Sequence, residues 1–263
     1  MSYFRTTREG ARSSFVSTEE SGNRRPISSL LGGLIEWWEM QETSAGSSPV
    51  TRVGSFAGLN LTDNNNIASD TGPSSTTAAK LVRASSQYFS RANSAALHNN
   101  GATGFEFCGW FRADSLAANS FLFSKDAVTD LANRQFNFVI LTTTGQLYLE
   151  IHNTGGGAGL ISDSLSLSVS VSTWYMLNFW FDTSNSKGYA SINAGTPEAG
   201  ASTLSGTLNA TGTSPLEIGA RSWGGGPQYS AVTMNRVGFW NRLLTSGERT
   251  ALYNAGAGKS YPF

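Results

Sequence analysis

The sequence predicts an all-β fold: two antiparallel sheets packed as a jelly-roll sandwich, with an extended N-terminal arm. Three observations favour this fold class. Many short runs alternate apolar and polar residues at the two-residue period of a strand. The chain holds 29 glycines, and serine, threonine and asparagine recur between the runs, as they do in turns. The sequence shows none of the helical crossovers that a parallel sheet requires.

Composition limits the classes of function. At 263 residues the chain can form one large β domain, and its 18 basic residues balance 18 acidic ones. This balance predicts no nucleic-acid partner, and without an apolar run of about 18 residues we expect no membrane insertion. The first residues lack an apolar leader core, so export through a cleaved leader is not expected. The single cysteine, Cys108, is expected to be a buried apolar residue.

Residues 1–33 are expected to form the arm, because they are polar and show no sustained period. The arm is either a disordered tail or a segment that orders against a neighbouring subunit. Aromatic and arginine side chains are enriched at interface anchors. The predicted partner-binding residues of the arm are therefore Tyr3, Phe4, Arg5, Arg8, Arg12 and Phe15.

The sandwich domain is expected to span residues 34–263. Residues 34–40 form its first strand, and a long polar loop over residues 41–77 follows. A strand region comes next at residues 79–89, and residues 105–112 form a central aromatic strand.

Residues 136–141 and 147–151 form the clearest hairpin, because apolar residues alternate on both sides of a short turn. Two amphipathic strands of this register need a second sheet to cover them. We therefore expect Phe107, Phe138 and Phe179 to meet in a shared interior. Further strands are expected at residues 121–125, 165–171, 174–182, 189–193, 216–219 and 232–240.

The hydrophobic period changes after residue 240. Thr245 is a candidate N-cap, with Glu248 three residues later as in a capping box. The short helix that follows is expected to end at Gly256 and Gly258.

Several motifs follow one another in a fixed order. They are Leu-Ile-Glu-Trp-Trp at 34–38, Phe-Glu-Phe-Cys-Gly-Trp at 105–110, Trp-Tyr at 174–175 with Asp182, Ile-Gly at 218–219, and Val-Gly-Phe-Trp-Asn-Arg-Leu-Leu-Thr at 237–245. This ordered set resembles the laminin-G-like members of the concanavalin-A-like lectin and glucanase superfamily, from residue 34 to the end of the chain. The resemblance implies the same jelly roll.

Some members of that superfamily are retaining glycosidases, whose motif places acidic side chains on one face of a strand. In this chain Glu36, Glu39 and Glu42 have spacings of three, which put neighbours on opposite faces. We interpret them as solvated or capping carboxylates. His98 and His152 lie in no nucleophile motif, and His152 is expected at the surface. The sequence therefore predicts no catalytic site.

Many relatives in the superfamily bind calcium, which requires several converging oxygens. Asn235 and Arg236 stand where relatives often carry an acidic residue before the last strand's valine. We therefore predict no required cofactor. The alternative is a calcium ion with Asp63, Asp126 and Asp182 as its candidate oxygen donors.

A carbohydrate site needs an exposed aromatic platform flanked by amides and hydroxyls. Trp223 lies in a glycine-rich loop, unlike the strand tryptophans, which we interpret as packing residues. The predicted ligand-binding residues are Trp223, Arg221, Gln228 and Tyr229. The alternative for Trp223 is that it folds back onto an edge of the sandwich.

The arm, the sandwich and the C-terminal stretch look like those of laminin-G-like proteins from tailed bacteriophage particles. This resemblance implies a non-catalytic virion protein, either a capsid decoration or a fibre. It would bind other virion proteins through its arm and assemble as a homo-oligomer. The first alternative is a host-surface glycan-binding adhesin at the bacterial cell surface or in the extracellular space. The second is a glycoside hydrolase.

Overall fold

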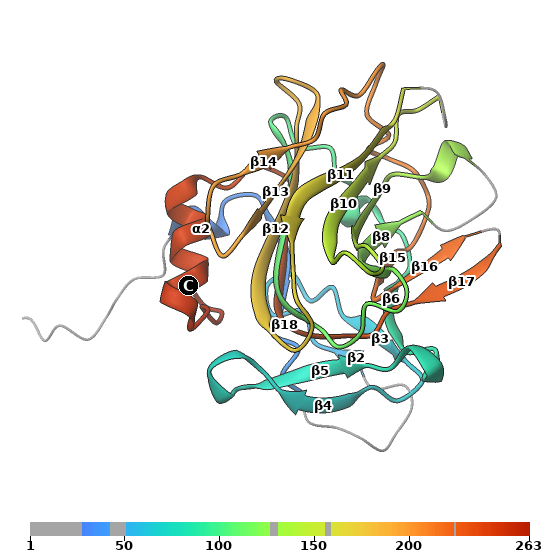
Figure 1. The fold of residues 1–263 in the computed structure, drawn as a ribbon. Coiled ribbons are helices and arrows are strands. Elements are labelled where there is room, and N and C mark those ends of the chain that lie inside the picture. Colours follow the sequence, from blue (N-terminus) through green and yellow to red (C-terminus); the bar gives the residue numbers. More distant parts are fainter. Residues whose placement is uncertain (1–27, 43–50, 127–130, 156–158, 224) are drawn as a thin grey trace, which may run out of the picture.

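The computed structural model describes residues 28–42, 51–126, 131–155, 159–223 and 225–263. Two large antiparallel sheets pack face to face, which confirms the predicted sandwich (Figure 1). In spatial order, sheet A consists of β14 (Glu198–Ala199), β13 (Lys187–Ile192), β12 (Trp174–Asp182), β7 (Gly104–Ala113), β18 (Val232–Trp240), β5 (Thr77–Leu81) and β4 (Ala68–Thr71), and β1 (Leu34–Trp38) also pairs with β18.

Sheet B forms the second layer. In spatial order it consists of β11 (Ile161–Ser168), β10 (Gln146–Ile151), β9 (Phe136–Ile140), β8 (Ser120–Lys125), β15 (Leu216–Ile218), β6 (Tyr88–Arg91), β3 (Leu61–Asn64) and β2 (Thr51–Arg52). A separate hairpin contains β16 (Ala220–Trp223) and β17 (Gly226–Tyr229). The expected loop at 41–77 therefore contains three short strands, of which β4 belongs to sheet A and β2 and β3 belong to sheet B.

Helices are short and few in the described ranges. The α-helices are α1 (Ser28–Leu31) and α2 (Ser246–Tyr253), and the 3-10 helices are η1 (Pro73–Ser75), η2 (Arg83–Ser85), η3 (Ala95–Leu97), η4 (Leu131–Asn133) and η5 (Asn254–Gly256). None of these helices has the length and apolar character needed to cross a membrane.

Aromatic side chains fill the space between the sheets. The ring of Phe107 stacks on Phe239 with 4.0 Å between centroids and lies 5.9 Å from the ring of Phe138. Phe138 in turn stacks on Phe179 at 5.0 Å. All four side chains are fully buried, so the predicted meeting of Phe107, Phe138 and Phe179 is confirmed.

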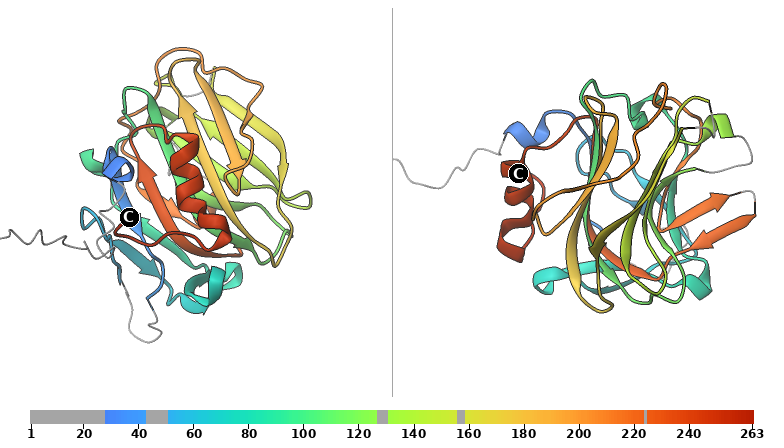
Figure 2. Two further views of the ribbon diagram at one scale, coloured as in Figure 1. Left: turned by 90° about the vertical axis from the view of Figure 1, so that its left-hand side faces the viewer. Right: turned by 45° about the horizontal axis from the view of Figure 1, so that its top comes forward.

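A second hydrophobic cluster covers the outer face of sheet A. Figure 2 shows α2 lying across this face. Trp37, Trp110 and Trp240 are buried there with Leu252 of the helix and the C-terminal Phe263. Trp110 and Trp240 are therefore packing residues, as predicted for them.

The capping box at the start of α2 is confirmed, because Thr245 and Glu248 each accept from the backbone of the other. The predicted end of the helix was wrong. Asn254 takes the left-handed conformation, with φ of 48°, and closes the helix before Gly256 and Gly258.

A buried ion pair fastens α2 to the sheet. Arg249 donates to both carboxylate oxygens of Glu106, at 2.8 Å each, and its guanidinium lies over Trp180 at 3.8 Å from the ring centroid. Burial raises the pKa of Glu106, and the hydrogen bonds from Arg249 oppose that rise. Cys108 is buried on the same strand, as predicted.

The predicted arm is described only from residue 28. Its proposed partner-binding residues, Tyr3, Phe4, Arg5, Arg8, Arg12 and Phe15, lie outside the described residues. In α1, Leu30 is fully buried and its carbonyl accepts from Trp240 Nε1 at 2.8 Å. The end of the predicted arm therefore packs on the sandwich.

The acidic cluster near β1 has protein partners, as predicted for capping carboxylates. Glu36 is fully buried and accepts from the backbone of Phe56 and Leu59 at 2.6 Å each. Glu39 accepts from Trp37 Nε1 at 2.8 Å, and Glu42 lies 3.3 Å from Arg52.

Candidate ligand-binding site

The candidate site is built on the hairpin of β16 and β17, which pairs Arg221 with Gln228 and Trp223 with Gly226. Figure 1 shows the hairpin on the side of sheet B that faces away from sheet A. The chain turns into it at Gly219, which has a φ of +88°. A Cβ atom at this position would lie 2.0 Å from Leu81 Cδ1, so the turn strongly favours glycine.

Hydrogen bonds attach both strands of the hairpin to the sandwich. On the β16 side, Glu217 accepts from the backbone nitrogen of Ser222 at 2.7 Å and from its hydroxyl. On the β17 side, Arg83 Nε donates to the carbonyl of Tyr229 at 2.7 Å. Burial raises the pKa of Glu217, although the bonds from Ser222 oppose the rise.

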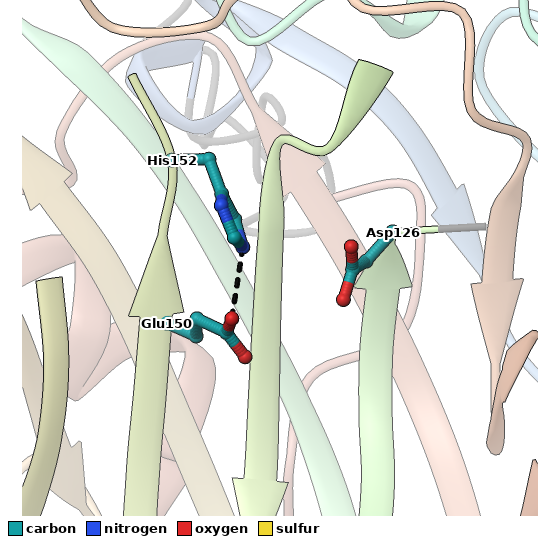
Figure 3. Close-up of side chains that lie close together, drawn as sticks. All are labelled: Asp126, Glu150 and His152. Carbon is teal, nitrogen blue, oxygen red and sulfur yellow. Dashed lines mark ion pairs between the residues drawn. The ribbon is translucent and has the colours of Figure 1, made fainter. Parts of the chain in front are cut away.

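A group of charged and polar side chains lies on the outer face of sheet B. We call it the outer-face cluster, and it comprises Asp126, Arg134, Asn137, Glu150, His152 and Arg221. Asp126 directly follows β8, Asn137 lies on β9, and Glu150 on β10 is opposite Asn137. Figure 3 shows Asp126, Glu150 and His152 close together. The cluster therefore joins three neighbouring strands to the hairpin.

The side chains of the cluster are closely paired. Asn137 Nδ2 donates to Asp126 at 2.6 Å and to Glu150 at 3.2 Å. Arg221 pairs with Asp126 and lies 3.6 Å from Glu150. Arg134 Nε lies 3.0 Å from Asp126 Oδ1.

His152 completes the cluster, with its Nε2 atom 3.0 Å from Glu150 Oε1 (Figure 3). It is only 1% exposed, so its predicted place at the surface was wrong. Its ring turns toward Glu150, and Asn209 donates its backbone N–H to the carbonyl of His152 at 2.9 Å.

The pKa values of the two carboxylates of the cluster shift in opposite directions. Burial raises the pKa of Asp126, and the charge of Arg221 opposes this rise without cancelling it. Burial also acts to raise the pKa of Glu150. There the hydrogen bond from His152 and the charge of Arg221 outweigh burial and lower the pKa.

The cluster does not fit calcium. Atoms of Asp126, Glu150 and His152 lie within 4.8 Å of one another, and within the described ranges no other such group of three acidic, histidine or cysteine side chains occurs. Calcium takes oxygen ligands, whereas this set includes an imidazole. Arg134 and Arg221 already supply positive charge to Asp126.

The three aspartates predicted as calcium donors do not form one group. Asp63 accepts from the backbone of Ile67 at 3.0 Å and lies 3.5 Å from Arg52. Asp182 accepts from Ser184 in its own turn. We therefore derive no calcium chemistry from these residues.

A groove lies beside β17, and we call it the hairpin groove. Its volume is about 510 Å³, and it is lined by Arg83, Ala117, Ala118, Asn119, Phe121, Thr142, Pro227, Gln228 and Tyr229. The side-chain amide of Gln228 and the hydroxyl of Tyr229 have no hydrogen-bond partner among the described residues. Pro227, Phe121 and the alanines supply apolar surface.

The four residues predicted to bind a ligand lie on this one hairpin. Gln228 and Tyr229 line the groove. Arg221 is opposite Gln228, but its guanidinium contacts Asp126 and Glu150. Trp223 ends β16, and its side chain lies outside the described part of the chain. Arg83 was not anticipated, because it is far from the hairpin in the sequence.

Comparisons with known proteins agree with this architecture. The sequence profile of a family described as the concanavalin A-like lectin/glucanases superfamily matches residues 83–248. A search of curated proteins finds no match.

Among solved structures, the binding domain of Paraclostridial mosquitocidal protein 1 is similar, with a TM-score of 0.64 and 13% identity over 86% of this chain and 53% of that one. The binding domain of botulinum neurotoxin serotype C1 has a TM-score of 0.60 and 10% identity, over 85% of this chain and 52% of that one. Trypanosoma rangeli sialidase has a TM-score of 0.59 and 16% identity, over 87% of this chain and 34% of that one. The chain thus spans about half of each toxin domain and a third of the sialidase, and these identities show the fold alone.

Proposed function

The chain belongs to the concanavalin A-like lectin/glucanases superfamily, and we propose that it is a non-catalytic module that binds a glycan in the hairpin groove. One observation carries the proposal. The groove combines the free amide of Gln228 and hydroxyl of Tyr229 with apolar walls. Sites for small ligands typically join a few placed polar groups to apolar surface in this way.

A sugar ring matches that combination. Its hydroxyls point outward around the edge, and its faces present C–H groups. The amide of Gln228 can donate and accept at the same time, as hydroxyls do, and so can the hydroxyl of Tyr229. Pro227, Ala117 and Ala118 line the groove and are exposed, so they offer apolar surface to the ring faces.

The outer-face cluster supports binding without chemistry. Asp126 and Glu150 are close enough for a retaining glycosidase, whose carboxylates lie about 5 Å apart. The side chain of Asp126 is, however, 0% exposed, and its oxygens are taken up by Arg134, Asn137 and Arg221. A sugar could not reach this carboxylate without breaking those pairs. The cluster is better explained as the attachment of the hairpin to sheet B.

A glycan array tests the proposal. The side chain of Gln228 is exposed and has no hydrogen-bond partner among the described residues, so Gln228→Ala should preserve stability and weaken glycan binding by about fivefold or more. Trp223→Ala tests the predicted aromatic platform in the same assay. Asn100→Ala is the matched control, because Asn100 is an exposed amide outside the groove. If the wild type binds no glycan, or Gln228→Ala binds as the wild type does, the proposal is wrong.

We also retain the proposal that this module belongs to a phage particle, attached through the arm. It rests on the sequence resemblance. Because Leu30 already packs on the sandwich, the arm to be removed is residues 1–27. The full chain should remain on purified particles while the shortened chain dissociates, and equal retention would count against attachment through the arm.

A further inference from the structure

Arg83 differs from most other arginines in the described ranges. Seven of the nine arginines there have a carboxylate oxygen within 4.0 Å, namely Arg52, Arg112, Arg134, Arg221, Arg236, Arg242 and Arg249. Arg83 and Arg91 have none among the described residues. A half-buried guanidinium without an anionic partner has lost part of its hydration and gained no opposite charge.

The position of Arg83 is fixed by neutral oxygens. Its Nε donates to the carbonyl of Tyr229 at 2.7 Å, and its Nη2 donates to the carbonyls of Ala118 and Asn119 at 3.0 and 3.2 Å. The third nitrogen, Nη1, has no hydrogen-bond partner among the described residues. The side chain is therefore held rigidly while donors on one edge stay available.

Arg83 also lines a second hollow, of about 410 Å³. Leu81, Val82, Ala84 and Ala231 give that hollow mainly apolar walls. Asp114 lines it too, but Arg112 Nε lies 2.8 Å from its carboxylate. Arg83 is the residue that the linings of the hairpin groove and the second hollow share.

We propose that Arg83 binds an anionic group of the ligand, so that the groove selects acidic glycans bearing a carboxylate or a sulfate. This inference rests on the proposed glycan-binding function and narrows it. The free edge of the guanidinium forms charge-assisted hydrogen bonds with the anion, which are about twice as strong as neutral ones. Apolar groups next to the anion on the same sugar lie in the second hollow.

The test uses an array with matched neutral and acidic sugars, including lactose, 3′-sialyllactose and 3′-sulfated lactose. The wild type should bind acidic members at least about tenfold more tightly than their neutral counterparts. The sialyl and sulfated members decide which anion is preferred. Higher salt should weaken acidic binding and leave neutral binding nearly unchanged.

Two variants separate the charge of Arg83 from its structural bonds. Arg83→Gln removes the charge. Arg91→Gln is the control, because Arg91 also has no carboxylate partner among the described residues and lines neither hollow. Ala118→Asp keeps Arg83 and places a competing carboxylate beside it, and Ala118→Asn is its neutral control. Arg83→Gln and Ala118→Asp should each lose about tenfold in acidic binding, whereas the controls should change less than about twofold.

The outcomes distinguish the two proposals. Equal binding of neutral and acidic sugars by the wild type would overturn the role of Arg83 and leave glycan binding standing. If Ala118→Asp bound acidic sugars as tightly as the wild type does, the role of Arg83 would also be overturned and glycan binding would stand. This result would hold even if Arg83→Gln failed to fold. An array without any bound sugar would overturn both.

Discussion

Removing Arg221 should destabilise the protein, because Asp126 would stay buried with less positive charge beside it. Asp126 is fully buried, and Arg221 pairs with it and lies 3.6 Å from Glu150. Breaking a buried ion pair by removing one partner costs about 3–5 kcal/mol. Arg134 and Asn137 still contact Asp126, so we expect a loss near the lower limit, about 3 kcal/mol, for Arg221→Met.

A double-mutant cycle isolates the charge interaction. In Asp126→Asn the carboxylate is gone, so adding Arg221→Met should cost less than it does in the wild type. We expect a coupling energy of at least about 1 kcal/mol, within the range found for residues in one ion-pair network. Urea unfolding followed by tryptophan fluorescence measures each free energy. Arg91→Met is the control and should lose less than about 1 kcal/mol, because no carboxylate in the described ranges pairs with Arg91.

The same cycle can refute the reasoning. A coupling energy below about 0.5 kcal/mol would mean that the hairpin is not held by these charges. The hairpin would then be held by the hydrogen bonds that the side chains of Glu217 and Arg83 make with its backbone.

Three further predictions follow from single contacts. Gly219→Ala should lower the free energy of unfolding by about 1–3 kcal/mol, because a methyl group at positive φ would meet Leu81; an unchanged urea midpoint would contradict it. Burial raises the pKa of the Cys108 thiol and blocks access, so a thiol reagent should label the protein only after unfolding, and rapid labelling of the native protein would show the assignment to be wrong. The hydrogen bond from Arg112 lowers the pKa of Asp70 from 3.8 to about 2. The ionised carboxylate therefore stabilises the fold at pH values above 3.8, and this stabilisation is lost as the pH falls toward about 2. Asp70→Asn should therefore reduce the loss of stability between about pH 4 and about pH 2 by about 1 kcal/mol, allowing for solvent screening, and identical pH profiles in urea unfolding would exclude this role.

Local patterns predicted the fold well because neighbouring residues carry the signal. The alternation in β9 and β10 predicts both strands, and the pairing of Phe138 with Leu149 places their apolar residues in the core. Thr245 and Glu248 predict the start of α2, since both halves of a capping box lie within four residues. The end of the helix was misjudged because Asn254, like glycine, can adopt the left-handed conformation.

The outer-face cluster could be predicted only in part. The pairing register of β9 and β10 alone places Asn137 opposite Glu150 on the outward face of sheet B. Asp126 and Arg221 lie on separate elements. Their ion pair forms only because the hairpin of β16 and β17 folds back over sheet B. The burial of His152 was also missed in the sequence. Strand alternation gives the direction of a side chain, but it does not reveal whether a later segment covers that face.

The arginines of the hairpin region show why ligand roles need the structure. Arg221 lies on the predicted glycine-rich segment, yet the carboxylates of Asp126 and Glu150 already pair with its charge. Arg83 lies on a 3-10 helix with no motif around it, and among the described residues its guanidinium donates to three carbonyl oxygens and the Ser120 hydroxyl, all of them neutral. The sequence presents both as isolated basic residues, because their partners are distant along the chain. Among the described residues Arg221 pairs with carboxylates and Arg83 does not. That difference is why we infer structural support for Arg221 and propose ligand selection for Arg83.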